Sequence, residues 1–235
     1  MLNAEEFIKT LKSYQSEKEY RKIERYFQED DEDNRIIGVR MKMIFDLASD
    51  NREMPLDEVE KLLGAPWYEA RMGAVSIMDF RVRSKQTPPE LRKQLFDLYI
   101  DRHDRINTWD FVDRSAPRVV GGYLYELGKP RDILYRLARS DNPWERRTAI
   151  VSTGYFIRNG ELDDTFQIAE LLLNDDHELV QKAVGTFLRH AGKQDPERLH
   201  SFLETHAAGM PRTMLTIAME KLDKKQRAYY RSLKE

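Results

Sequence analysis

The sequence predicts an all-helical protein made of repeated helix pairs. Three observations support this prediction. Apolar residues recur at intervals of three and four in most windows, as at Ala74, Ile77 and Met78. Alternating apolar and polar runs joined by two-residue hairpin turns are missing from the sequence. Similar segments also return at a nearly constant spacing. We therefore expect helices throughout the chain and no sheet.

The repeat is defined by six segments that share a polar or basic start followed by an apolar helix. Successive starts are 34, 41, 35, 34 and 32 residues apart, at Asn34, Tyr68, Trp109, Trp144, Glu178 and Met210. The intervening stretches, such as the one that begins at Pro89, supply partner helices. A helix pair recurring every ~35–45 residues is typical of HEAT-like solenoids. We expect about six antiparallel pairs in one domain, residues 1–235, with a concave face.

Composition excludes several classes of protein. The chain has no cysteine, so disulfides and thiolate chemistry are excluded. None of its five histidines are spaced i, i+4, so no helical zinc motif is present. No stretch approaches the ~20 consecutive apolar residues of a membrane helix, and the N-terminus lacks the apolar run of a signal peptide. We expect a cytoplasmic monomer with no metal and no membrane contact.

The distribution of charge is more informative than its sum. The formal net charge of −2 does not by itself indicate a nucleic-acid-binding protein. Cations nevertheless recur near the start of the second helix of most pairs: Arg40, Lys42, Arg71, Arg114, Arg118, Arg146, Arg147, Lys182 and Arg212. If these helices line the concave face, their cations form a stripe that can contact phosphates. The alternative is that each cation only solvates a helix surface.

Several ordered motifs resemble those of the AlkD-type DNA alkylation-repair family. Its W-D-x-V-D motif stands at Trp109 to Asp113, its S-D-x-x-W-x-x-R segment begins at Ser140, and its Q-K-A-[IV]-G begins at Gln181. Further matches are Arg25-Tyr26, Gly38-Val39-Arg40 and Pro211-Arg212-Thr213. The resemblance implies a tandem helical-repeat fold around duplex DNA. It also implies excision of N3- and N7-alkylated purines without a metal or cofactor.

The resemblance also implies roles for individual residues. Asp113 corresponds to the catalytic carboxylate, Trp109 to one of two aromatic partners, and Arg147 to the basic residue beside the lesion. Tyr26 corresponds to an N-terminal tyrosine that contacts DNA. We expect further DNA contacts from Arg40, Arg71, Arg118, Arg146, Lys182 and Arg212. Such a protein would be nucleoid-associated when it is bound to DNA.

The chemistry expected of Trp109 and Asp113 follows from their spacing. Residues at i and i+4 lie on one face of a helix. A tryptophan ring attracts a cation such as an N-alkylated purine. A carboxylate beside the sugar stabilises oxocarbenium character and can position or deprotonate water. The alternatives are a core role for Trp109, a helix-start or ion-paired role for Asp113, and a surface ion pair of Arg147 with Asp113 or Glu145.

Two positions on one predicted helix depart from the family's pattern. Thr186 stands where a tryptophan typically forms one wall of the lesion cleft, and His190 stands where a carboxylate is common. A smaller, polar wall would either admit bulkier adducts or weaken the interaction with a cationic base. Separately, the run from Glu29 to Asp33 supplies five carboxylates, which would repel phosphate beside a DNA groove.

Two other functions therefore remain open. Thr186 favours a DNA-binding relative that has lost catalysis. A protein-binding HEAT adaptor belongs to a different class, and it would carry apolar or mixed residues along the concave face in place of a cation at each repeat.

Overall fold

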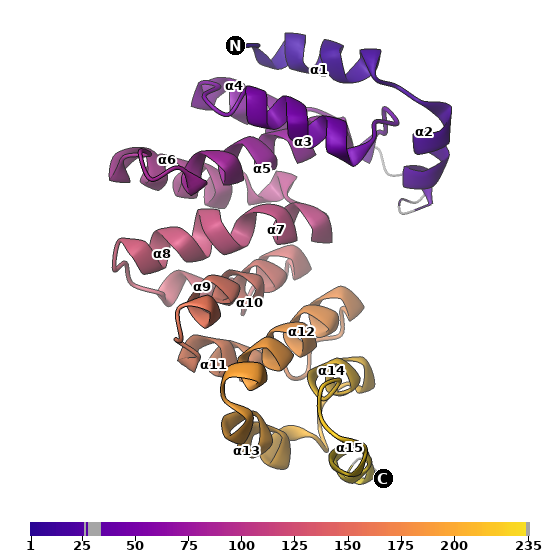
Figure 1. The fold of residues 1–235 in the computed structure, drawn as a ribbon, viewed down its shortest axis with the longest axis vertical. Helices are drawn as coiled ribbons and strands as arrows, with labels where there is room; N and C mark the ends of the chain where they lie inside the picture. The colour runs from indigo at the N-terminus through magenta and orange to yellow at the C-terminus, as the bar shows by residue number, and fades with distance from the viewer. Residues whose placement is uncertain (26, 28–33, 234–235) are drawn as a thin grey trace. The chain divides into compact units, whose positions relative to one another are not determined.

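The computed structural model describes residues 1–25, 27 and 34–233, and its regular structure is helical (Figure 1). The predicted all-helical fold class is therefore confirmed. Within these described residues no strand is present, and the recorded β-type pairing is an isolated bridge between Arg35 and Trp67. Tyr26 and the acidic run from Glu29 to Asp33 lie outside the described residues. No helix in the described part has the length and apolar character required to cross a membrane.

The chain divides into two compact units, residues 1–107 and 108–235. Unit 1 contains α1 (Ala4–Ser13), α2 (Glu17–Glu24), α3 (Met41–Asp50), α4 (Leu56–Gly64), α5 (Tyr68–Arg83), α6 (Pro89–Asp101) and the 3-10 turn η2 (His103–Arg105). Unit 2 contains α7 (Trp109–Ala116), η3 (Pro117–Gly122), α8 (Tyr123–Glu126), α9 (Asp132–Leu137), α10 (Pro143–Arg158), α11 (Asp163–Leu171), α12 (Glu178–Gln194), α13 (Pro196–His206), α14 (Arg212–Ala218) and α15 (Lys224–Ser232). The single domain expected for residues 1–235 stays a prediction.

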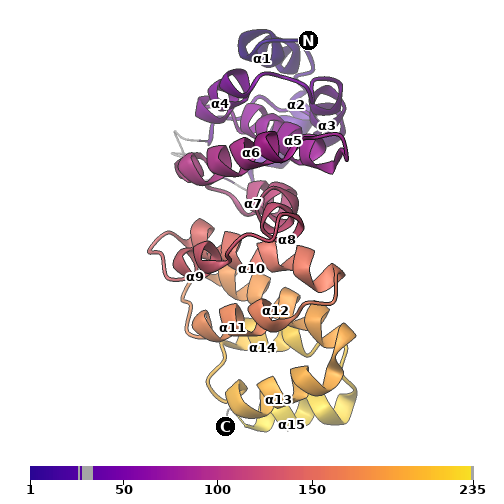
Figure 2. The same ribbon diagram turned by 90° about the vertical axis from the view of Figure 1, so that its left-hand side faces the viewer.

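Unit 2 is built from stacked helix pairs. Helix α10 packs against α12, and α12 packs against α14. On the other side, α9 and α11 contact α10, and α13 contacts α12 (Figure 1). The last helix, α15, lies beside α13 (Figure 2), where the ring nitrogen Nδ1 of His200 is 2.8 Å from the Tyr230 hydroxyl. Each pair therefore buries its apolar face against its neighbours, as the repeat predicted.

The first repeat segment starts with an extended stretch before its helix. The segment begins at Asn34 with a polar start, and its helix, α3, begins only at Met41. Gly38 has φ +94°, a conformation that interrupts a right-handed helix. The buried carboxylate of Glu69 on α5 accepts hydrogen bonds from the N–H groups of residues 37–39, at 2.8 to 3.2 Å. Because a side chain satisfies these donors, the segment stays extended in the interior of unit 1.

The helix that carries Asp113 changes its winding just after that residue. Pro117 has no N–H, so the Asp113 carbonyl loses its usual α-helical donor, and residues 117–122 wind as a π-helix. Such segments are rare and frequent at functional sites. Gly121 brings this helix against α10, because a Cβ there would lie 2.2 Å from the Ser152 carbonyl oxygen. Helices α7 and α10 are thereby held close together.

Candidate active site

Asp113 and Arg147 form the centre of the candidate site. Arg147 on α10 donates from Nη2 to both carboxylate oxygens of Asp113 at 2.9 Å, and from Nε to Oδ1 at 3.1 Å. Its Nη1 donates to the backbone carbonyl of Leu179 on α12. Arg147 is only 7% exposed, whereas the Asp113 side chain is 39% exposed. The cation is therefore buried, and its carboxylate partner is accessible to solvent.

The surroundings of Asp113 shift its acidity. Burial raises the pKa of the Asp113 carboxyl above its ordinary value of 3.8, although the Arg147 guanidinium acts in the opposite direction. The charge of Asp110 raises the pKa slightly further. A raised pKa makes this carboxylate a better proton acceptor than an ordinary aspartate. This property suits a group that takes a proton from water.

Trp109 is exposed one helical turn before Asp113. Its exposure of 43% excludes the alternative that it is a core aromatic. The next residues anchor the helix: Phe111 and Val112 are fully buried, and the Asp110 carboxylate accepts a hydrogen bond from the Phe111 N–H at 3.0 Å. Because α7 is fixed on its buried side, Trp109 and Asp113 are left on the side that solvent can reach.

The sequence left open that Arg147 forms an ion pair with Asp113, and this ion pair is present in the structure. The pair is not a surface one, because the Arg147 side chain is 8% exposed. An ion pair and a catalytic role are compatible here. A carboxylate oxygen has two lone pairs, so the exposed side of Asp113 keeps acceptor capacity for water or a sugar.

Arg146 is engaged in different contacts from Arg147. Its Nε lies 2.6 Å from a carboxylate oxygen of Asp175, whose side chain is 1% exposed. Its Nη1 donates to the carbonyls of Ser140 and Asp141 at 3.0 and 2.9 Å. These contacts join the start of α10 to the segment before α12. A hydrogen bond from Arg146 to DNA would have to replace these contacts. The geometry therefore favours a structural role in which Arg146 holds the two segments together.

Arg71 disagrees with the expectation of a direct DNA contact. Its residue exposure is 0%, and it lies inside unit 1. Its guanidinium donates to the side-chain oxygen of Asn107 at 3.0 Å and also to that of Asn34. A phosphate cannot reach this group without opening the fold. Arg71 therefore joins segments within unit 1 in this structure.

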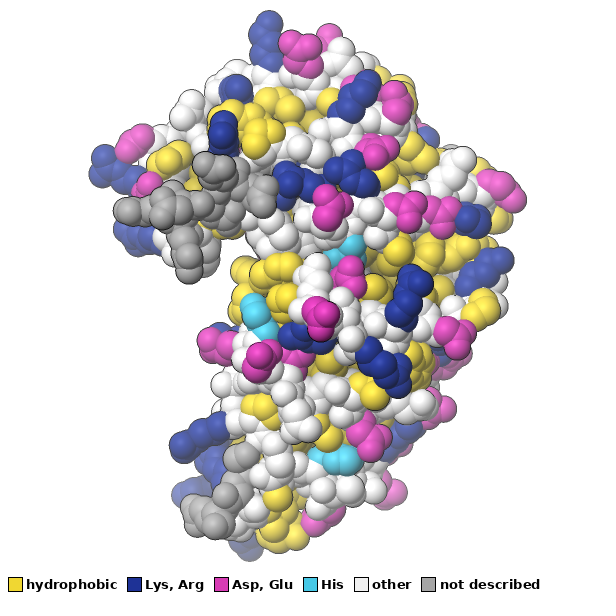
Figure 3. All heavy atoms as spheres, turned by 180° about the vertical axis from the view of Figure 1, so that it is seen from behind, with side chains coloured by type: hydrophobic (Ala, Val, Ile, Leu, Met, Phe, Trp, Pro, Cys, Tyr) yellow, Lys and Arg dark blue, Asp and Glu magenta, His cyan; other side chains and the backbone are white. Residues whose placement is uncertain are grey.

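The other expected DNA contacts remain accessible. Arg40, Lys182 and Arg212 are exposed, and Arg118 is partly buried. Lys182 forms an exposed pair with Glu178 at 2.7 Å, which solvent screens and DNA can displace. Because Arg40 belongs to unit 1 and the others to unit 2, a surface shared by all of them stays a prediction. On the face drawn in Figure 3, cationic and acidic side chains are intermingled.

Helix α12 carries Thr186 and His190, the two positions that the resemblance predicts to differ from the family's pattern. Thr186 is half-buried. The neighbouring Phe187 ring lies over Gly154, where a Cβ would be 2.6 Å from it, and it meets the His190 ring edge-on at 5.6 Å. Burial and nearby cations, with Arg189 first among them, lower the pKa of His190. This favours a neutral imidazole, in keeping with a polar residue near a helix end.

Sequence reasoning missed Leu179 and Asp175 as parts of the site. The Leu179 contribution is a backbone carbonyl, which every residue possesses, so no sequence signal marks it. Asp175 stands two residues before His177, the N-cap of α12, and accepts a hydrogen bond from the His177 N–H at 2.9 Å, so its position carried no N-cap signal. Trp144, at the start of α10, packs against the residue before α12: its ring meets the His177 ring edge-on at 5.3 Å.

Comparison with known proteins places this geometry in context. The sequence matches the family described as DNA alkylation repair enzyme over residues 7–222. No curated protein matches it significantly. Among solved structures, one described as a predicted DNA alkylation repair enzyme from Enterococcus faecalis superposes with a TM-score of 0.70 at 16% identity, covering 89% of this chain and 97% of that chain. At this identity the likeness shows a shared fold.

Proposed function

The chain belongs to the DNA alkylation repair enzyme family, and we propose that it is a DNA glycosylase for cationic N3- or N7-alkylated purines in duplex DNA, acting as a cytoplasmic monomer. One observation carries the proposal. An exposed indole and a solvent-facing carboxylate lie one turn apart on α7, and a buried guanidinium holds the carboxylate. This combination offers a surface for a cationic base beside a group for the sugar.

The proposed reaction breaks the bond between C1′ of the deoxyribose and the purine nitrogen. The bonding electron pair leaves with the purine, so the cationic base departs neutral and needs no general acid. The sugar gains oxocarbenium character, which the Asp113 carboxylate stabilises electrostatically. Water then attacks C1′ and gives its proton to Asp113, leaving an abasic site and a free base.

Trp109 and Arg147 have distinct parts in this proposal. The Trp109 ring face stabilises the positive base by a cation–π contact, worth about 0.5–2 kcal/mol. Arg147 acts through Asp113 and is a positioning residue. Three hydrogen bonds to the carboxylate fix its rotamer, and the bond to Leu179 fixes the guanidinium itself. A fixed carboxylate loses less orientation entropy in the transition state.

Base release from alkylated duplex DNA tests the proposal. Duplex treated with a methylating agent is incubated with wild type or Asp113→Asn, and free 3-methyladenine and 7-methylguanine are measured by chromatography. We expect release by wild type and its loss in the variant, with DNA binding retained. Asp132→Asn, which changes an exposed acid in the first turn of α9, serves as the matched control and should release base like wild type.

Two outcomes would overturn the proposal in different ways. Equal release by wild type and Asp113→Asn would remove Asp113 from the mechanism. No release by wild type, with duplex binding intact, would favour the alternative of a DNA-binding relative that has lost catalysis. Thr186 is the residue that motivates this alternative, since it replaces an aromatic cleft wall in the family's pattern.

A further inference from the structure

Residues 175–179, which lead into α12, meet the start of α10 at two points. We call them the α12 entry segment. At the first point, the Arg146 guanidinium binds both carboxylate oxygens of Asp175, with Nε at 2.6 Å and Nη2 at 3.1 Å. At the second point, Nη1 of Arg147 donates to the Leu179 carbonyl. One end of the entry segment is therefore anchored to α10, and its other end supplies an acceptor to the arginine that holds the carboxylate of the candidate site.

The anchor at Asp175 is buried and bonded on several sides. Its side chain is 1% exposed. Besides Arg146, its Oδ1 accepts a hydrogen bond from the His177 N–H at 2.9 Å, and its backbone carbonyl accepts one from Nε2 of Gln181 at 2.8 Å. The hydrogen bond with Asp175 is the first cause that raises the pKa of Arg146 above its ordinary value. Because a carboxylate is costly to bury unless it is paired and hydrogen-bonded, these contacts tie the entry segment to one position.

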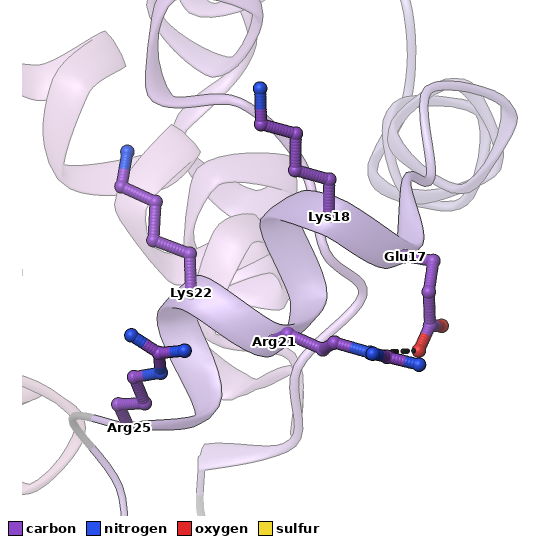
Figure 4. Close-up of a pocket in the computed structure, with 5 residues that line it drawn as sticks. All are labelled: Glu17, Lys18, Arg21, Lys22 and Arg25. Atoms are coloured by element: carbon purple, nitrogen blue, oxygen red, sulfur yellow. Dashed lines mark hydrogen bonds and ion pairs between the residues drawn. The ribbon is translucent and has the colours of Figure 1, made fainter.

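Exposed charges elsewhere on the protein lack this constraint. Asp176, the next residue, is 97% exposed, with Nη2 of Arg146 at 3.6 Å. In the open cleft along α2 in unit 1, Arg21 turns toward Glu17, and both side chains are 72% exposed (Figure 4). Solvent screens such pairs, so they contribute little to positioning. Asp175 and Asp176 carry the same charge side by side, but of the two only Asp175 is packed against α10.

The Arg147 guanidinium connects the entry segment to Asp113. Its Nη1 donates to the Leu179 carbonyl, while its Nη2 and Nε donate to the Asp113 carboxylate. A guanidinium is planar and rigid, so all of its donors move together. A shift of the Leu179 carbonyl would therefore turn the donors that face Asp113. Because Asp175 anchors the segment that carries this carbonyl, the position of the Asp113 carboxylate depends on a residue outside its own hydrogen bonds.

We propose that Asp175 is a positioning residue, which acts through the entry segment, the Leu179 carbonyl and Arg147 to set the orientation of the Asp113 carboxylate. The proposal rests on the proposed function only where base release is the readout. The alternative is that Asp175 does no more than stabilise unit 2. It would then affect the free energy of unfolding and leave the Asp113 carboxyl of the folded protein unchanged.

The sign of the effect on the pKa of Asp113 separates positioning from charge. The Arg147 guanidinium lowers this pKa, against burial and the charge of Asp110, which raise it. Loosening the entry segment weakens the contact of Arg147 with the carboxylate and should raise the pKa further. Removing the negative charge of Asp175, or leaving Arg146 without its counter-charge, can only lower the pKa of a nearby carboxyl. A rise in the pKa therefore reports positioning.

The test compares three variants of the full-length chain. Asp175→Asn removes the buried charge, and Asp176→Asn removes the same charge from its exposed neighbour as the matched control. Gln181→Ala loosens the entry segment without a change of charge. The Asp113 carboxyl is titrated by NMR of its carboxyl carbon, with the signal assigned from Asp113→Asn, and urea denaturation checks folding. The single-turnover rate of base release from methylated duplex at saturating protein is measured in parallel.

Asp175→Asn should raise the pKa of Asp113 by about 0.5–1 pH unit, a fraction of the ~1–3 by which an adjacent cation lowers the pKa of a carboxyl. Its base release should be about ten- to a hundredfold slower, since a small misplacement of a reacting group is costly. Gln181→Ala should change both quantities in the same direction. Asp176→Asn should behave like wild type in both.

Several results would overturn the positioning role. One is a pKa of Asp113 that is unchanged or lowered in folded Asp175→Asn, and if that variant does not fold, the same result in Gln181→Ala decides. Another is an equal rise in Asp176→Asn, and a third is wild-type base release by a variant whose Asp113 pKa has risen. A rise in Asp175→Asn but not in Asp176→Asn, with no base release by any form, would support the positioning role and reject the glycosylase.

Discussion

Arg147 donates three hydrogen bonds to the Asp113 carboxylate, at 2.9 to 3.1 Å, and a fourth to the carbonyl of Leu179. Through these bonds one buried guanidinium joins α7, α10 and α12. The carboxylate is therefore held by groups that are far away in the sequence. Both the stability of unit 2 and the chemistry proposed for Asp113 depend on this contact. Substitutions of Arg147 that remove or keep its positive charge separate the effect on stability from the effect on base release.

Replacing Arg147 should lower stability and base release together. Arg147→Ala leaves Asp113 and the Leu179 carbonyl without their partner, which we expect to cost about 1–3 kcal/mol of unfolding free energy, less than for a fully buried pair because Asp113 is 39% exposed. Urea denaturation measures this loss. Arg147→Lys keeps the positive charge but cannot donate from two nitrogens to the carboxylate at once. Base release by this variant should therefore fall even under conditions where it is fully folded. Wild-type release by a folded Arg147→Lys would exclude the positioning role.

The pH dependence of base release should reflect the raised pKa of Asp113. The reaction needs the carboxylate, so the single-turnover rate should fall with decreasing pH, with a midpoint above the ordinary value of 3.8. Spontaneous depurination in protein-free samples is subtracted at each pH. A midpoint at or below 3.8 in folded protein would contradict a desolvated catalytic Asp113.

The same shift predicts how Asp113→Asn changes stability with pH. A raised native pKa means that the folded protein holds the proton more tightly than the unfolded chain does, so ionising Asp113 opposes folding. This cost is absent below 3.8, grows as the pH rises toward the native pKa, and is complete above it. The stability of Asp113→Asn relative to wild type should therefore rise across that window, on top of a pH-independent cost from leaving Arg147 without its carboxylate. Urea titrations at several pH values measure it, and a difference independent of pH would contradict the shift.

Trp109 should affect base release more than stability. The residue is 43% exposed, so Trp109→Ala should cost clearly less unfolding free energy than the roughly 3–5 kcal/mol of a fully buried tryptophan. Loss of a cation–π contact of about 0.5–2 kcal/mol corresponds to about two- to thirty-fold slower release. Leu171→Ala removes an apolar side chain of similar exposure, 40%, and is the control. Strong destabilisation by Trp109→Ala would instead indicate a structural role.

Arg71 and Arg212 should give opposite results in the same pair of assays. Arg71→Ala removes the partner of Asn34 and Asn107 inside unit 1, and we expect it to cost about 2–4 kcal/mol of stability. Arg212→Ala changes an exposed cation, so stability should be retained while duplex binding weakens and the salt slope falls by about 1. Undiminished duplex binding by Arg212→Ala would remove Arg212 from the DNA contacts.

Thr186→Trp tests whether position 186 on α12 forms a wall of the cleft for the alkylated base. An indole there would supply an aromatic wall, and a cation–π gain of about 0.5–2 kcal/mol would raise release of small methyl adducts about two- to thirty-fold. Thr186→Leu adds apolar volume without an aromatic face and should give a smaller rise. If neither variant changes release while duplex binding is intact, position 186 does not contribute a wall to the cleft.

The sequence by itself determined the helical repeat and the pairing of Trp109 with Asp113 on one helix face. Both follow from local periodicity, because the spacing of side chains along a helix is fixed by its own backbone. The start of α7 at Trp109 matches the repeat position. In the first repeat the helix begins only at Met41, since the carboxylate of Glu69, which is distant in the chain, accepts hydrogen bonds from the N–H groups of residues 37–39.

Only the tertiary structure decided which basic residues are free to meet a ligand. Arg71, Arg146 and Arg212 occupy comparable repeat positions and are the same residue type. Arg71 is buried against Asn34 and Asn107, Arg146 is held by the buried Asp175, and Arg212 is exposed. Their difference arises from partners contributed by other segments. A guanidinium binds whichever acceptors the fold brings to it, and local periodicity carries no information about those distant acceptors.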